Sequence, residues 1–250
     1  MRFHPCMTVL IALLLFASIS CSVFTHEGSQ VTLQTPDATP KNTVFVSQDW
    51  QEEFHLADRS LSNNGEAKFF ILRPGFQTIL TSQNEQLTIT VLDETRVIGG
   101  ITTRVVEERE EKKGSLYEVS RNFFTIDQET GDAFYFGEEV DFYENGVIVG
   151  HKGEWLAYEN DNKPGLIMPG NPVVGMKYYQ EMAQGVAMDR AEVIDVSAVF
   201  TSQAGEFEDC LITKESSKIE PGTEQKTYCP GIGLVQDQSL LLASYGTQGN

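Results

Sequence analysis

The charged side chains in the middle of this chain are the first candidates for chemistry, because they fall on segments that resemble strands. Four of them could form an ionic network if they faced the interior: Arg104, Glu107, Glu118 and Arg121. Such a network is costly unless every member is paired. It would then either line a polar ligand site or fix the register of the strands. The alternative is that these side chains form the solvated face of an antiparallel sheet.

A second acidic group lies between two of the strand-like segments. The run Asp127-Gln128-Glu129-Thr130-Gly131-Asp132 brings three carboxylates together, and calcium prefers several oxygen ligands around a tight turn. Asp127, Glu129 and Asp132 are therefore candidate ligands. The EF-hand loop needs its glycine one position later than Gly131, however, so the pattern favours an acidic hairpin turn over a metal site. No cofactor is expected.

Motifs for hydrolysis are missing from the sequence. Beyond the first 20 residues the histidines are His26, His55 and His151, and no two of them have the spacing of a zinc site. The sequence has no Gly-x-Ser-x-Gly elbow either. A carboxylate pair could still hydrolyse a glycoside, although no pair is singled out. We therefore expect a protein that is not an enzyme.

Cys210 and Cys229 could form a disulfide or remain as two buried thiols. An exported protein would favour a disulfide, worth about 2–4 kcal/mol of stability. A tight turn at residues 220–223, however, would set Cys210 opposite Gly233. A bridge to Cys229 would then need a longer loop or a bulge. The other outcome is two buried thiols.

Residues 1–20 have the pattern of a signal peptide, which predicts export. Arg2 and His4 precede an apolar run at residues 9–17, and small residues follow it. The run is too short to span a bilayer comfortably.

Cys21 follows Ser18-Ile19-Ser20, which resembles the lipobox of bacterial lipoproteins, except that Ser18 stands where an aliphatic residue is usual. The resemblance implies that Cys21 is acylated and anchors the chain to a membrane essentially permanently. Ordinary cleavage with a soluble product is the alternative.

Residues 21–43 are rich in Ser, Thr, Gln and Pro, which predicts a flexible stalk before a single β-rich domain at residues 44–246. The centre of this domain is residues 102–155, where strand-like segments alternate with turns such as Asn145-Gly146. Consecutive hairpins predict a mainly β fold with an antiparallel meander. About a dozen strands should curl into a barrel, a half-barrel or a two-layer sheet.

Residues 159–175 form the one long segment without a strand pattern, and they contain three prolines and three glycines. A loop of this length either covers a functional site or crosses one end of the core. Leu166, Ile167 and Met168 would plug that core, which is the interpretation we favour.

The charge balance excludes some classes of partner. The chain has 18 Lys and Arg against 36 Asp and Glu, a net charge of −18. Such a protein repels nucleic acid and anionic membrane surfaces, and it attracts cations.

Several phrases resemble a widespread group of uncharacterised bacterial exported proteins, many of which carry lipoprotein signals: GGITTRVVEERE, EVSRNFF, GDAFYFGEEV, PGLIMPGNPVVGMKYYQE, GVAMDRAEV and CPGIGLVQD. They cover roughly residues 69–237. The resemblance implies a β-rich domain of the periplasm or envelope, akin to half-barrels that carry lipoproteins or lipids. It implies no activity and no catalytic residue.

Three functions follow from these features, in order of preference. The first is a lipid-anchored carrier whose curved sheet binds a lipid-like or other apolar ligand. The second is a structural or interaction protein of the cell envelope with a filled core and a protein partner. The third is a hydrolase that acts on an envelope polymer.

Overall fold

The computed structural model describes residues 49–248. The predicted signal peptide, Cys21, the stalk and the first residues of the predicted domain lie outside the described residues. Among residues 49–248, no helix has the length and hydropathy to cross a membrane.

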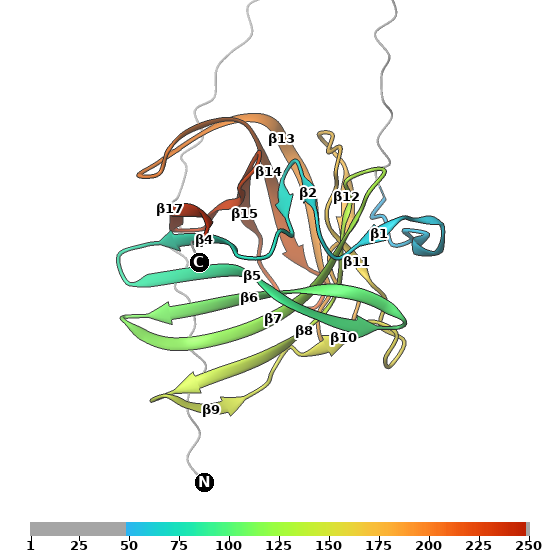
Figure 1. Ribbon diagram of the computed structural model, residues 1–250, viewed down its shortest axis with the longest axis horizontal. Helices are drawn as coiled ribbons and strands as arrows, with labels where there is room; N and C mark the ends of the chain where they lie inside the picture. The colour runs from blue at the N-terminus through green and yellow to red at the C-terminus, as the bar shows by residue number, and fades with distance from the viewer. Residues whose placement is uncertain (1–48, 249–250) are drawn as a thin grey trace, which may run out of the picture. The chain divides into compact units, whose positions relative to one another are not determined.

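The described part of the chain is built almost wholly from β-strands (Figure 1). A single 3-10 helix, η1 (Leu56–Asp58), precedes them. In chain order the strands are β1 (Leu61–Ser62), β2 (Glu66–Ala67), β3 (Phe70–Ile71), β4 (Phe76–Thr81), β5 (Glu85–Ile98), β6 (Ile101–Lys112), β7 (Ser115–Asp127), β8 (Ala133–Glu144), β9 (Val147–Gly150), β10 (Trp155–Leu156), β11 (Gly165–Met168), β12 (Lys177–Tyr179), β13 (Asp189–Ser202), β14 (Gly205–Ser217), β15 (Glu224–Cys229), β16 (Gly233–Asp237) and β17 (Leu240–Thr247).

Within residues 49–248, fifteen of these strands form one sheet in the order β10-β8-β7-β6-β5-β4-β17-β16-β15-β14-β13-β12. Strand β1 pairs with β7, while β9 and β11 pair with β8. Strands β2 and β3 pair only with each other. The predicted antiparallel meander is confirmed from β4 to β8. The pairing of β4 with β17 joins it to a second meander formed by β13–β17.

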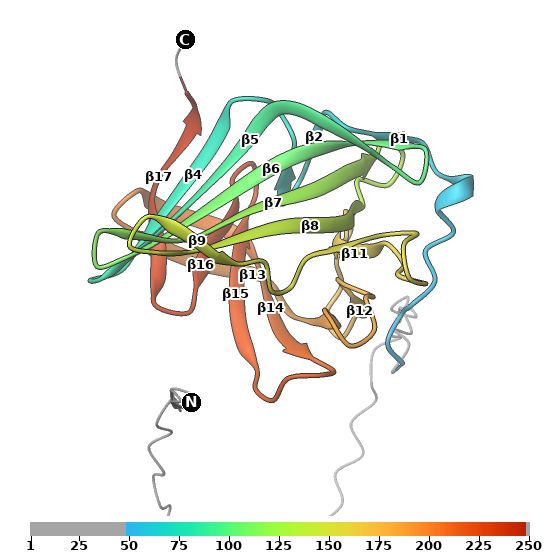
Figure 2. The same cartoon turned by 90° about the horizontal axis from the view of Figure 1, so that it is seen from below.

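The sheet folds over on itself, so that β13–β16 lie across from β5–β8 (Figure 2). Its two ends, β10 and β12, do not pair with each other. Of the three arrangements predicted, a closed barrel is therefore excluded, and a sheet curled into two layers is compatible with this strand order. A sheet of this length curls because each strand is rotated relative to its neighbour, and the rotations accumulate.

The turns of the first meander follow the sequence closely. Lys113 and Gly114 have φ of 54° and 74°, and Asn145 and Gly146 have φ of 51° and 77°. Two consecutive residues with positive φ form the turn that matches the twist of a hairpin. The predicted turn at Asn145-Gly146 is confirmed, and Lys113-Gly114 forms a turn with the same backbone signs.

The segment 159–175 is less irregular than predicted. It contains β11, which pairs with β8 and buries Leu166 and Met168. The two layers approach closely here, because a Cβ added at Gly165 would lie 2.0 Å from the carbonyl oxygen of Gln180. Only glycine permits this approach, which a pattern of prolines and glycines does not distinguish from a loop.

A disulfide joins Cys210 on β14 to Cys229 at the end of β15, with 4.3 Å between their Cα atoms. The last pair of the β14–β15 ladder is Glu215 with Glu224. Residues 216–223 therefore form a longer connection than the predicted tight turn at residues 220–223. This connection shifts the register so that the two cysteines, rather than Cys210 and Gly233, come opposite each other.

Replacing both cysteines by alanine is expected to lower the free energy of unfolding by about 3 kcal/mol, because the bridge restrains the unfolded chain. Denaturant unfolding of the natural and double-variant proteins measures the difference. Reductant should destabilise the natural protein to the level of the variant and leave the variant unchanged. A natural protein that is insensitive to reductant under unfolding conditions would contradict the bridge.

Candidate functional site

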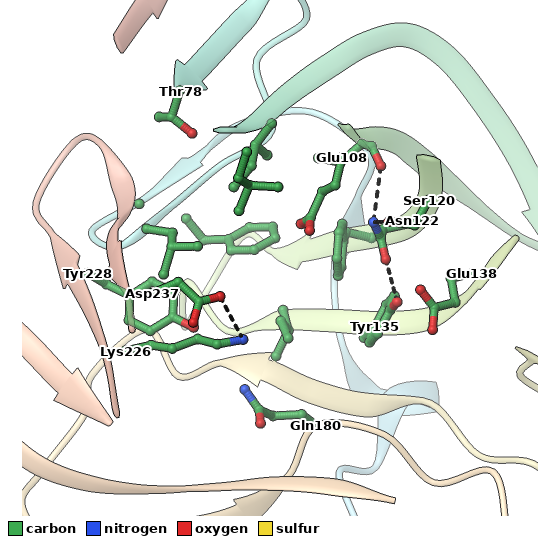
Figure 3. Close-up of a pocket in the computed structure, with 18 of the residues that line it drawn as sticks. Thr78, Glu108, Ser120, Asn122, Tyr135, Glu138, Gln180, Lys226, Tyr228 and Asp237 are labelled. Carbon is green, nitrogen blue, oxygen red and sulfur yellow. Dashed lines mark hydrogen bonds and ion pairs between the residues drawn. The ribbon is translucent and has the colours of Figure 1, made fainter. Parts of the chain in front are cut away.

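A cavity of about 400 Å³ lies between the two layers of the sheet (Figure 3). Alternate residues of each strand point into it, as the period of two in a strand requires. Leu87, Ile89 and Val91 of β5 thus line the cavity together, while their neighbours point to the opposite face. The cavity is the candidate site, because it gathers side chains from both meanders.

One part of the cavity wall is apolar. Leu87, Ile89 and Val91 are joined there by side chains from β3, β4, β6, β7, β11 and the region of β16: Phe70, Ile71, Phe76, Val106, Phe124, Ile167, Ile232 and Leu234. Phe124 also stacks on Tyr135, with 4.7 Å between the ring centroids. This wall offers contacts for an aliphatic or aromatic group.

The rest of the wall is strongly acidic. Eight carboxylates line the cavity, from β6, β7, β8, the residues after β12, and β13, β14 and β16: Glu108, Glu110, Glu118, Glu138, Glu181, Asp189, Glu215 and Asp237. Lys226 of β15 is the one basic side chain among the described lining residues. The lining therefore has eight acidic groups against one basic group.

Lys226 is already shared among several carboxylates. Its Nζ lies 3.4 Å from Glu215 Oε2, 3.4 Å from Glu224 Oε1 and 3.6 Å from Asp237 Oδ2. Burial disfavours the charged lysine, yet these carboxylates hold the pKa of Lys226 well above its ordinary value. The Lys226 ammonium is therefore held at one end of the cavity by these ion pairs.

Three carboxylates that form no direct ion pair with Lys226 have raised pKa values. Burial, with the nearby charge of Glu110, raises the pKa of Glu118 to about 7. Burial is also the main cause for Glu108, whose pKa rises to about 7, and for Glu138, whose pKa rises to about 8. Each acid disfavours the ionisation of the others, because like charges in one site repel.

A chain of hydrogen bonds fixes the polar part of the wall. The Tyr135 hydroxyl donates to Asn122 Oδ1, and Asn122 Nδ2 donates to Ser120 Oγ at 3.0 Å (Figure 3). Asn122 Nδ2 also lies 3.4 Å from the carbonyl oxygen of Val106. These groups satisfy one another and hold the positions of β7 and β8.

Two other polar side chains of the lining are buried without a partner. Gln180 is 3% exposed and Thr78 is 4% exposed, and neither side chain makes a hydrogen bond to any residue in 49–248. Figure 3 shows the Gln180 amide pointing into the cavity on the side of Lys226. Buried polar groups are normally satisfied, so these two are suited to hydrogen-bond a bound molecule.

A second hollow of about 430 Å³ adjoins the cavity and shares Asp189 and Glu215 with it. Its other lining residues include Glu220 and Glu224, from the connection between β14 and β15 and the start of β15. The negative charge of the cavity therefore continues along this side of the sheet.

No protein-family model, no curated protein and no solved structure matches this chain. Its resemblance to exported bacterial proteins stays a prediction, and the geometry of the site carries the functional argument.

The predicted ionic network does not form as one group. Residues an odd number of positions apart point to opposite faces of a strand, so Arg104 and Glu107 cannot share a face, nor can Glu118 and Arg121. Glu118 lines the cavity. Glu107 and Arg121 are cross-strand partners on the opposite face, where Arg121 Nη1 binds Asp141 Oδ2 at 3.2 Å.

Arg104 has a structural role at the end of the sheet. It is 6% exposed, and its guanidinium donates to the carbonyl oxygens of Asn63, Leu92 and Glu94. Its Nη1 also lies 3.3 Å from Asp93 Oδ1. These contacts hold the irregular part of β5 against the segment after β1.

The acidic turn after β7 binds an arginine. Arg59 Nη1 lies 3.0 Å from Asp127 Oδ2 and 2.7 Å from Asp132 Oδ2, and it contacts Thr130 Oγ1 at 3.2 Å. Glu129, the third candidate ligand, takes part through its N–H, which donates to Asp127 Oδ1. Within residues 49–248, no group of three His, Cys, Asp or Glu side chains could hold a metal ion.

Sequence reasoning identified only Glu118 among the acids of the cavity as a candidate site residue. The available signal was the alternation in β6, where Val106, Glu108 and Glu110 share one face. Because the inward face changes from apolar to acidic along the strand, the pattern resembles a solvated face.

Proposed function

We propose that residues 49–248 bind a small amphipathic molecule inside the folded sheet and that the protein is a carrier or binding protein without a catalytic step. The supporting observation is a cavity whose lining combines apolar side chains with two unpartnered polar side chains, Gln180 and Thr78. Pockets of this mixed kind bind the body of a ligand by burial and fix its orientation by a few polar contacts.

The acidic side chains of the cavity argue against two kinds of lipid-like ligand, those that are purely apolar and those that are anionic. A purely apolar molecule would leave Gln180 and the carboxylates without partners, and an anionic lipid would be repelled by them. A cavity of this size also disfavours the alternative of an envelope protein with a filled core. An amphipathic ligand with a polar head satisfies both walls.

The proposal includes export and anchoring. Under it, residues 1–20 are removed, Cys21 is acylated, and residues 21–43 link the binding domain to a membrane of the bacterial envelope. The pattern of the N-terminal sequence supports this part.

Binding in the cavity is testable with N-phenyl-1-naphthylamine, a neutral probe whose fluorescence rises in apolar surroundings. Thr78→Phe should reduce its affinity about tenfold or more, because the larger side chain fills the cavity. The matched variant Thr78→Val keeps the shape of threonine and should retain binding. The measurement is a fluorescence titration of each folded protein, with folding checked by circular dichroism.

Two results would contradict the proposal. One is an absence of probe binding by the natural protein, and the other is equal binding by Thr78→Phe. Turnover of an envelope polymer that is abolished by one carboxylate substitution would instead favour the hydrolase.

A further inference from the structure

Three acids of the cavity are influenced by a basic side chain only at a distance: the charge of Lys226 acts on Glu108 and Glu181, and that of Lys112 acts on Glu118. Among the described residues, no side chain forms a hydrogen bond or an ion pair with the carboxylates of Glu108, Glu118 or Glu181. They come from β6, β7 and the residues after β12, so both layers of the sheet contribute to this cluster. A buried carboxylate is costly without a direct partner, and no described side chain pairs directly with these three.

A buried polar side chain elsewhere in the wall of the same cavity is also suited to a ligand. Gln180 directly precedes Glu181, and its amide is buried, without a partner, and directed into the cavity (Figure 3). An amide can both accept a hydrogen bond from a ligand N–H and donate one to a ligand oxygen. The acidic cluster is thus accompanied by an independent group that lacks only a bound partner.

We infer that the polar head of the ligand is a positively charged amine, held by the cavity acids Glu108, Glu118 and Glu181, with Gln180 in the wall of the same cavity. This inference rests on the proposed function. The ammonium would supply the direct counter-ion that the cluster lacks, and its N–H groups would donate charge-assisted hydrogen bonds to the carboxylates. The apolar remainder of the ligand would lie against Leu87, Ile89 and Phe124.

The surroundings of the cavity favour the same class of ligand. Glu220 and Glu224 extend the negative charge into the adjoining hollow, and the whole chain has a net charge of −18. A path lined with one sign of charge raises the local concentration and the association rate of the opposite charge. Cationic amphipaths would therefore be drawn toward the site, whereas fatty acids and anionic phospholipids would be repelled.

The pKa values of the acids would respond to a bound ammonium. Burial and mutual repulsion raise the pKa of Glu108 and Glu118 to about 7. An ammonium placed among them would favour their charged forms and lower those pKa values.

A series of probes with one chain and three heads tests the inference. Octylamine, octanol and octanoate compete with N-phenyl-1-naphthylamine at about pH 8, where most of the cluster can ionise. Octylamine should bind about ten to a hundred times more tightly than octanol, and octanoate should be the weakest of the three. The competition titration gives all three affinities on one protein.

Matched variants test whether the acids of the cavity cause the preference for octylamine over octanol. Glu108→Gln combined with Glu118→Gln should bring the affinity for octylamine close to that for octanol. Glu107→Gln removes one charge from β6 on the face away from the cavity, so it should keep the preference for the amine.

The outcomes separate the two proposals. If the dye enters the cavity and octanol competes as well as octylamine, the inference is overturned while the proposed function stands. A preference for the amine that survives the double substitution also overturns it. If neither the dye nor any of the three probes binds the natural protein, the proposed function itself fails.

Discussion

The variant in which Glu108 and Glu138 are both replaced by glutamine is expected to be more stable than the natural protein at about pH 8, by about 2–4 kcal/mol. At about pH 5 the two proteins should differ little. In the folded protein the pKa of Glu108 is raised to about 7 and that of Glu138 to about 8, mainly by burial. Both carboxyls face a cavity that water can enter, which keeps the effect below the full value of the shifts.

The sign follows from counting protons. The unfolded chain releases these two protons near pH 4.5, the usual pKa of a glutamate, whereas the folded protein holds them until about pH 7 and 8. Between these limits the folded state binds more protons, so the free energy of unfolding of the natural protein falls as the pH rises. Glutamine has no proton to lose, so the variant escapes this destabilisation.

Urea unfolding of ligand-free protein across this pH range measures the effect. The control is Glu107→Gln, whose carboxylate is on the opposite face of β6 and pairs with Arg109 at 3.7 Å. That variant should follow the pH dependence of the natural protein. A double variant with an unaltered pH dependence would show that the two acids ionise freely in the folded state.

Arg59→Met should destabilise the protein by about 3 kcal/mol, because it leaves a buried carboxylate without its main counter-ion. The Asp127 side chain is 4% exposed. Burial opposes its charge, but the N–H of Glu129 and the guanidinium of Arg59 hold the pKa of Asp127 below its ordinary value. Arg59 also donates from Nε to the carbonyl oxygen of Phe54 at 3.0 Å and lies over the ring of Phe134.

A comparison of variants separates charge from geometry. Arg59→Lys keeps the charge but loses the fork that reaches two carboxylates and a carbonyl, so it should recover only part of the stability. Adding Asp127→Asn to Arg59→Met should recover another part, because it removes the stranded charge. Chemical unfolding of the single and double variants gives the coupling energy. If the two losses simply added, the ion pair would have no energetic role.

Local features of the fold could be predicted from the sequence because they depend on neighbouring residues. The turns at Lys113-Gly114 and Asn145-Gly146 are determined by residues that tolerate positive φ. The curling of the sheet follows from the number of strands. Strand β11 was missed, because the glycines and prolines around it are equally typical of a loop.

The candidate site could not be predicted, because its residues come together from distant strands. Glu108 and Glu181 meet only when the two layers close, and sequence alone does not show which face of β6 is inside. The alternation of side chains along a strand could have excluded part of the predicted ionic network. Arg104 and Glu107 are an odd number of residues apart, so they point to opposite faces of the sheet. The pairing of Arg59 with Asp127 spans 68 residues, which no local pattern can indicate.

The pairing of β4 with β17 has a consequence for when the protein can fold. Strand β4 is the first strand of its meander and β17 is the last of the sheet, so the sheet becomes continuous only after almost the whole chain is present. Contacts between distant residues slow folding, because the chain between them must first be ordered. A shorter, growing chain would leave β4 and β16 as open edges, which invite pairing with other chains. The eight residues of β17 therefore set the earliest moment at which the nascent protein is safe from aggregation.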